Sequence, residues 1–89
     1  MEIINIGAKS VEIYPNPFSS YTIITIPDNL LKPCSLELFD LSGDKVYSYS
    51  NIISNKFILG RGQLNKGSYF YKIYNPDFSF LSTGKIIVN

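Results

Sequence analysis

Apolar and polar residues alternate along most of this chain with a period of two rather than 3.6 residues. Such alternation is typical of β-strands with one buried face, and the β-branched and aromatic residues that dominate it favour strands. Clusters of proline, glycine, asparagine and aspartate interrupt the pattern at short intervals. It predicts an antiparallel β-sandwich of seven or eight strands, over residues 11–14, 21–26, 35–41, 45–50, 56–59, 68–74 and 78–88.

The middle of each predicted strand supplies the expected core. Ile24, Leu38, Val46 and Tyr71 each lie on an apolar face, so we expect them to be buried. Gly84 stands inside the last predicted strand, where a glycine indicates a bulge or a bend.

The chain has 89 residues, which is the size of one domain, and shows neither a repeat nor an internal linker. Residues 11–89 are expected to form that domain. Residues 1–10 are either a linker remnant from an upstream cargo or an edge strand, since they include three isoleucines. They lack the basic and apolar regions of a secretory signal, so an exported parent would carry its signal further upstream.

Composition removes several classes of function. The formal net charge is +1, which gives no electrostatic reason to expect nucleic acid as a partner, and no apolar stretch is long enough to insert into a membrane. The sequence contains no histidine and one cysteine. Histidine-dependent nucleophiles, internal disulfides and cysteine-rich metal sites are therefore excluded, and we expect no enzyme activity and no cofactor.

The remaining reactive side chains have structural interpretations. Glu37, Asp40 and Asp44 do not follow the spacing of a calcium loop, and Asp40 is expected to accept hydrogen bonds from turn amides. Cys34 is expected to be a buried thiol. Gly60 and Gly62 belong to a loop, because the rest of a phosphate-binding motif is missing.

The strand at residues 68–74 is rich in aromatic residues and leaves two interpretations open. Alternate rings, including Tyr69 and Tyr71, fill the core, while Phe70 and Tyr74 cover the outer face. Alternatively, exposed tyrosines bind carbohydrate, and the chain is a carbohydrate-binding or spacer β-sandwich module of a secreted multidomain enzyme.

Three segments carry a family resemblance when they are read together. Residues 14–18 read Tyr-Pro-Asn-Pro-Phe, and residues 38–46 read Leu-Phe-Asp-Leu-Ser-Gly-Asp-Lys-Val. The third segment, residues 64–73, reads Leu-Asn-Lys-Gly-Ser-Tyr-Phe-Tyr-Lys-Ile and is closed by residues 84–88, which read Gly-Lys-Ile-Ile-Val and lie one residue before the C-terminus. In this order and spacing they resemble the C-terminal sorting domain of the type IX secretion system, the Por secretion tail (type A).

The resemblance implies an immunoglobulin-like sandwich of about seven strands that serves as an address. The parent protein would cross the inner membrane, pass through the periplasm, and be secreted or displayed on the cell surface. The implied partners are an N-terminal cargo domain, the outer-membrane translocon, and a sortase-like cysteine peptidase that removes the tail.

The resemblance also assigns roles to residues. The candidate recognition residues form the C-terminal end: Gly84, Lys85, Ile86, Ile87, Val88 and Asn89. The residues of the family motifs expected to be structural are Pro15, Asn16, Pro17, Asp40, Gly43, Gly67 and Tyr69. A translocon would read the solvent-exposed chain end by strand addition, and the two prolines would keep the junction with the cargo extended. Asn89 departs from the family, which often places a basic residue at this position.

Overall fold

A computed structural model describes residues 11–28, 32–77 and 81–89 of the chain. These residues form seven β-strands: β1 (Glu12–Tyr14), β2 (Tyr21–Thr25), β3 (Cys34–Phe39), β4 (Lys45–Ile52), β5 (Lys56–Gly60), β6 (Gly67–Tyr74) and β7 (Leu81–Val88). The described part contains no helix, and hence no helix long and apolar enough to span a membrane. The predictions for residues 1–10 and 78–80 lie outside the described residues.

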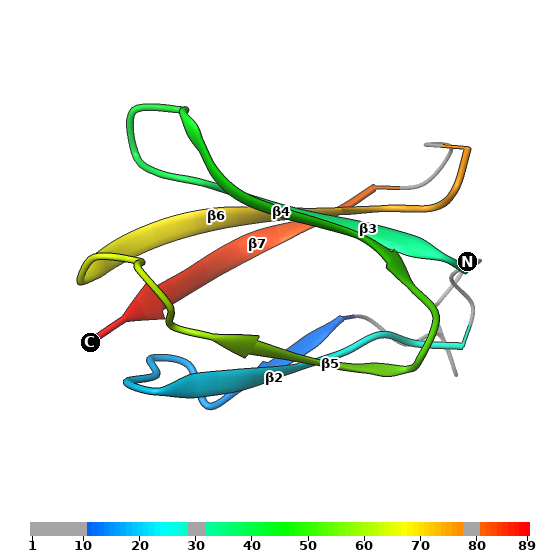
Figure 1. The fold of residues 1–89 in the computed structure, drawn as a ribbon, viewed down its shortest axis with the longest axis horizontal. Helices are drawn as coiled ribbons and strands as arrows, with labels where there is room; N and C mark the ends of the chain where they lie inside the picture. Colours follow the sequence, from blue (N-terminus) through cyan, green and yellow to red (C-terminus); the bar gives the residue numbers. More distant parts are fainter. Residues whose placement is uncertain (1–10, 29–31, 78–80) are drawn as a thin grey trace, which may run out of the picture.

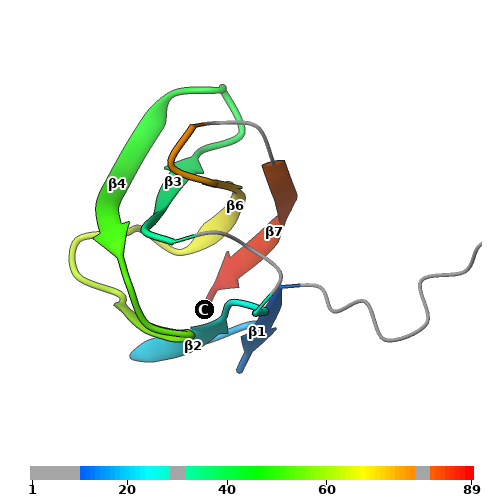
Figure 2. The same cartoon turned by 90° about the vertical axis from the view of Figure 1, so that its right-hand side faces the viewer.

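The strands form two antiparallel sheets that face each other (Figures 1 and 2). The first has the order β1-β2-β5 and the second the order β4-β3-β6-β7. The predicted all-β antiparallel sandwich is therefore confirmed. On one open side, a parallel bridge between Phe18 and Val88 connects the sheets. On the other side, the rings of Tyr49 in β4 and Phe57 in β5 lie with their centroids 4.9 Å apart.

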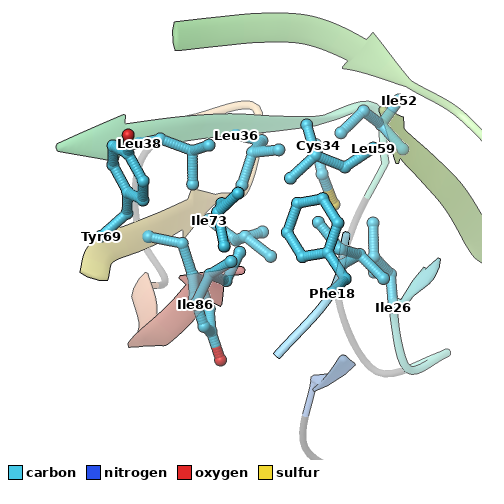
Figure 3. Packing of buried hydrophobic residues seen from close by; sticks show 13 residues of the cluster. Phe18, Ile26, Cys34, Leu36, Leu38, Ile52, Leu59, Tyr69, Ile73 and Ile86 are labelled. Carbon is cyan, nitrogen blue, oxygen red and sulfur yellow. The ribbon is translucent and has the colours of Figure 1, made fainter. Parts of the chain in front are cut away.

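The core fills the space between the sheets with alternate residues of each strand (Figure 3). Ile24 and Leu38 are fully buried and Tyr71 is 7% exposed, which confirms three of the four expected core residues. Phe18, from the loop before β2, inserts its ring among them. Because apolar surface removed from water is the main stabilising contribution in so small a domain, this alternation dictates the register of every strand.

The prediction that Val46 lies in the core is wrong, because its side chain is 42% exposed. In the β3–β4 ladder, Leu38 pairs with Tyr47 and Phe39 pairs with Lys45, so Val46 is an extra residue at a β-bulge. A bulge redirects the inserted side chain and shifts the alternation after it by one position. Tyr47 consequently packs against the core in place of Val46.

Candidate functional site

The last strand, β7, contains most of the candidate recognition residues and forms a continuous antiparallel ladder with β6. The ladder runs from the Gly67–Val88 pair to the Tyr74–Leu81 pair without a shift in register. Of the bulge or bend expected at Gly84, the bulge is absent from this ladder. Gly84 lies opposite Tyr71, and a Cβ atom added there would be 2.5 Å from Cε2 and Oη of that ring. The glycine makes room for a core tyrosine.

The two faces of β7 have different surroundings. Ile86 and Val88 are buried in the core, and Ile87 is half-buried. Lys85 and Asn89 are exposed. The apolar side chains of the C-terminal end thus serve the fold, and the side chain of Lys85 projects from the outer face of the sheet.

The free edge of β7 is covered by Asn16–Phe18, which we call the clasp. The Asn16 side-chain amide donates from Nδ2 to the Lys85 carbonyl and accepts at Oδ1 from the Ile87 amide, both at 2.9 Å. An asparagine side chain carries one donor group and one acceptor, so it can pair with a strand as a peptide group does. Its neighbours in the chain, Pro15 and Pro17, have no N–H group to offer.

Phe18 continues the same pairing toward the end of β7. Its amide donates to the Ile87 carbonyl at 3.0 Å, and its carbonyl accepts from the Asn89 amide at 2.9 Å. Figure 1 shows the C-terminal end of the chain beside the loop that leads into β2. The clasp therefore adds four hydrogen bonds to an edge that would otherwise offer its peptide groups to another strand.

Arg61, in the loop between β5 and β6, holds the main chain of Asn89. Its Nη1 donates to the Asn89 carbonyl at 2.8 Å, while its Nε donates to the Leu64 carbonyl at 3.0 Å. Asn89 is exposed, as expected of the chain end, but the backbone groups of Lys85, Ile87 and Asn89 that a partner strand would pair with are already hydrogen-bonded. Strand addition at these residues requires the clasp to leave first.

The residues of the first family motif lie together at the clasp. The Pro15 carbonyl accepts a hydrogen bond of 2.6 Å from the hydroxyl of Thr22, a buried residue of β2. This bond fixes the segment on one side of Asn16, and the buried ring of Phe18 fixes it on the other. Pro17 is exposed between them.

The second motif forms the β3–β4 hairpin, away from β7. The Asp40 carboxylate accepts from the amides of Ser42 and Asp44 at 2.9 and 3.0 Å, which confirms its expected role in the turn. Gly43 has a φ of 93°, a backbone conformation that side chains strongly disfavour.

The third motif begins β6, directly beside the end of β7. Gly67 has a φ of 149° and pairs with Val88. Tyr69 pairs with Ile86, is buried, and donates its hydroxyl to the Asn65 carbonyl at 2.6 Å. The first and third motifs therefore meet on the two sides of β7.

The reactive side chains do not converge on a catalytic centre within the described residues. Glu37 accepts from Lys45 Nζ at 3.2 Å and from the Tyr74 hydroxyl at 2.8 Å. Burial raises the pKa of Glu37, but these hydrogen bonds and the charges of Lys45 and Lys72 outweigh it and leave the pKa lowered. In the described part of the chain, no three acidic or cysteine side chains form a metal-binding group.

Cys34 is fully buried at the start of β3, as expected for a structural thiol. Burial raises its pKa, and the charge of Lys32 opposes this shift only in part. The thiol is therefore poorly suited to act as a nucleophile.

The sequence places Asn16 among the structural residues but does not predict that it binds the end of the chain, and it does not single out Arg61 at all. Arg61 lies between Gly60 and Gly62, where the sequence indicates only a loop. The pairing of Asn16 with β7 had one local signal, namely an asparagine placed between two prolines that cannot themselves donate to a strand.

Comparisons with known proteins identify a family and a solved structure with a similar fold. A family model described as the secretion system C-terminal sorting domain matches residues 12–89. A search of curated proteins finds no match. Among solved structures, the chain is similar to PorZ of Porphyromonas gingivalis, an essential surface component of the type IX secretion system of that bacterium. The TM-score is 0.70 at 19% sequence identity, and the match covers 89% of this chain and 11% of PorZ.

Proposed function

Because the chain belongs to the family of type IX secretion C-terminal sorting domains, we propose that the outer-membrane translocon and a sortase-like peptidase are its partners. The domain is the sorting signal of this secretion system, and it directs a parent protein across the outer membrane to the cell surface or the extracellular space. In our proposal the parent passes through the periplasm with the tail folded. The translocon then recognises the tail, and the peptidase removes it.

The observation that carries the proposal is the extent of the family match. It begins at the first residue of β1 and continues to Asn89, so it spans both sheets and the clasp. A match confined to one hairpin would support only a shared turn. We propose that Gly84–Asn89 forms the recognition end, and that the residues which hold the fold are Pro15, Asn16, Pro17, Asp40, Gly43, Gly67 and Tyr69.

The proposal also assigns no catalysis to this domain. The Asp40 carboxylate binds turn amides, the Glu37 carboxylate binds Lys45 and the Tyr74 hydroxyl, and the thiol is buried. The partners act on the domain, while a cargo domain upstream carries the activity of the parent protein.

The test attaches the 89-residue chain to a periplasm-targeted reporter in a bacterium with an active type IX system. We expect the reporter on the cell surface or in the medium, and we expect deletion of residues 84–89 to abolish its export. Since that deletion also removes Ile86 and Val88 from the core, Leu59→Ala serves as the control, because it weakens the same core from β5 without touching the end. Export should survive Leu59→Ala at a temperature where the variant stays folded.

Two outcomes would contradict the proposal. If the intact chain leaves the reporter in the periplasm while an established tail exports it, the chain is a spacer or carbohydrate-binding module instead. If the 84–89 deletion and Leu59→Ala reduce export in proportion to their loss of stability, the C-terminal end has no recognition role of its own.

A further inference from the structure

The clasp and the core leave one face of β7 accessible to a partner of the folded domain. The core takes the inner side chains, and Asn16 and Phe18 cover the edge at residues 85–89. A partner that binds this end therefore meets the outer face of the sheet, where the side chains of Lys85 and its cross-strand neighbours lie.

A row of four side chains crosses this outer face. The register pairs Lys45 of β4 with Phe39 of β3, Phe39 with Phe70 of β6, and Phe70 with Lys85 of β7. Residues directly opposite each other in a ladder point to the same side of the sheet. Two phenylalanine rings thus lie between two lysines, and Phe70 is 46% exposed.

The next row adds a third lysine. Lys72 pairs with Glu37 on one side and with Thr83 on the other, and its Nζ lies 4.9 Å from the centroid of the Phe39 ring. Between β6 and β7 the surface forms a shallow hollow of about 420 Å³, lined by Phe70, Lys72, Thr83 and Lys85 among others.

Positive charge is concentrated on this face although the whole chain is nearly neutral. Lys45, Lys72 and Lys85 contribute three positive charges and Glu37 one negative charge, which leaves +2 across these two rows. The carboxylate of Glu37 is already bound by Lys45 and by the Tyr74 hydroxyl. Asp40 and Asp44 lie at the hairpin turn beyond Phe39.

The outer face of the other sheet provides an internal comparison. There the register places Glu12 opposite Thr25, and Thr25 opposite Lys56, so the charged row has no net charge. The excess of positive charge therefore lies on the outer face of the sheet that contains β7.

We propose that this basic aromatic face (Phe39, Lys45, Phe70, Lys72 and Lys85) docks on an acidic, partly apolar surface of a protein of the translocation machinery. The inference rests on the proposed function and adds the surface and the chemistry of its partner. An exposed ring surrounded by lysines is suited to a protein surface, because aromatic residues supply contact energy while the charges around them steer association and set the register.

The test reverses charge on the two faces of the sandwich in the 89-residue reporter fusion. The variant K72E/K85E changes the basic aromatic face, K72R/K85R keeps its charge, and K56E changes an exposed lysine of the opposite face. Thermal unfolding of each purified fusion verifies the fold. Initial export rates are then measured by pulse-chase in type IX-competent cells.

We expect K72E/K85E to lower the initial export rate on the order of tenfold, since each reversal replaces a weak attraction by a similar repulsion. K72R/K85R and K56E should export like the unmodified fusion. A photo-crosslinking residue at Thr83 should capture a protein with an acidic surface, whereas the same residue at Thr25 should not.

Several results would overturn the inference. The first is that K72E/K85E is exported as fast as the unmodified fusion. The second is that K56E lowers the export rate as much as K72E/K85E does. The third is that a protein is crosslinked from Thr25 but not from Thr83. Absence of any protein crosslink at Thr83, with retention of the domain on anionic lipid vesicles, would indicate a membrane surface instead. Failure of the unmodified fusion to be exported is a separate result, because it contradicts the proposed function itself.

Discussion

Gly84→Ala is the substitution whose effect follows most directly from the geometry. The added Cβ would lie 2.5 Å from Cε2 and Oη of Tyr71 and 2.6 Å from its Cζ, which is far inside van der Waals contact. The ring is 7% exposed and packed in the core, so it must move against its neighbours. Overpacking of this kind costs about 1–3 kcal/mol. Replacing a strand glycine returns about 0.5–1 kcal/mol, because alanine loses less backbone entropy on folding.

The difference between these ranges is about 0–2.5 kcal/mol, and because the approach of 2.5 Å is close, we expect Gly84→Ala to lower the free energy of unfolding by about 1–2 kcal/mol. For a domain of this size that corresponds to a fall in Tm of roughly 5–15 °C. Urea denaturation and calorimetry measure both quantities. The matched control is Gly60→Ala in β5, where no atom lies within 4 Å of the added Cβ. Gly60→Ala should be neutral or slightly stabilising.

A double-mutant cycle with Tyr71→Leu identifies the cause of the loss. Leucine lacks the Cζ and Oη atoms that the new Cβ would meet, so Gly84→Ala should cost little in that background. The two substitutions should then couple by more than about 0.5 kcal/mol, as residues in contact do. If Gly84→Ala is harmless in the native sequence, or equally costly in both backgrounds, the steric account of Gly84 is wrong.

Three further predictions concern the core, the clasp and the acidic end of the pH range. Leu38→Ala should cost about 2–5 kcal/mol in urea denaturation, because the side chain is fully buried. Asn16→Ala should cost roughly 1–2 kcal/mol for two exposed hydrogen bonds, and hydrogen exchange should show faster exchange of the Ile87 amide with little change at Leu38. The pKa of Glu37 is lowered in the folded state, so its ionised form adds stability at pH values above its ordinary pKa of 4.5, and this contribution is lost as the pH falls through the lowered pKa. Glu37→Gln should therefore reduce the acid dependence of Tm below that pH, and an unchanged acid dependence would show that the interactions of Glu37 add nothing.

The sequence predicted the strands that have one buried face and a regular register. In β3, Leu36 and Leu38 point inward while Glu37 points outward, so polarity and orientation agree at these positions. The apolar Phe39 at the end of β3 is the exception, because it lies on the outer face. Such agreement holds because the period of a strand is two, and burial of one face leaves a single register that keeps the apolar residues inside. The sandwich followed from several such strands separated by turn residues.

The errors occur where a tertiary neighbour decides the outcome. Val46 has the polarity of a core residue, but the bulge between the Leu38 and Phe39 pairs turns it outward. Gly84 satisfies the local rule for a bulge, yet the Tyr71 ring on the adjacent strand is the reason for the glycine. Nothing within a few residues of either position encodes these effects. The hydrogen bond from Arg61 to Asn89 is another case, since it joins residues 28 positions apart.

Through the clasp, the pairing of the last residues of the chain depends on residues near the start of the described domain. The hydrogen bonds that Asn16 forms with Lys85 and Ile87 join residues 69 and 71 positions apart, so they close nearly the whole described domain into one loop. Closing a loop of that length costs conformational entropy, and the buried ring of Phe18 and the long β6–β7 ladder help to offset this cost. The paired edge at residues 85–89 therefore exists only when both sheets have formed. Since the same strand supplies Ile86 and Val88 to the core and Lys85 to the outer face, we expect a partner that recognises this end to require the folded domain and not a short linear peptide.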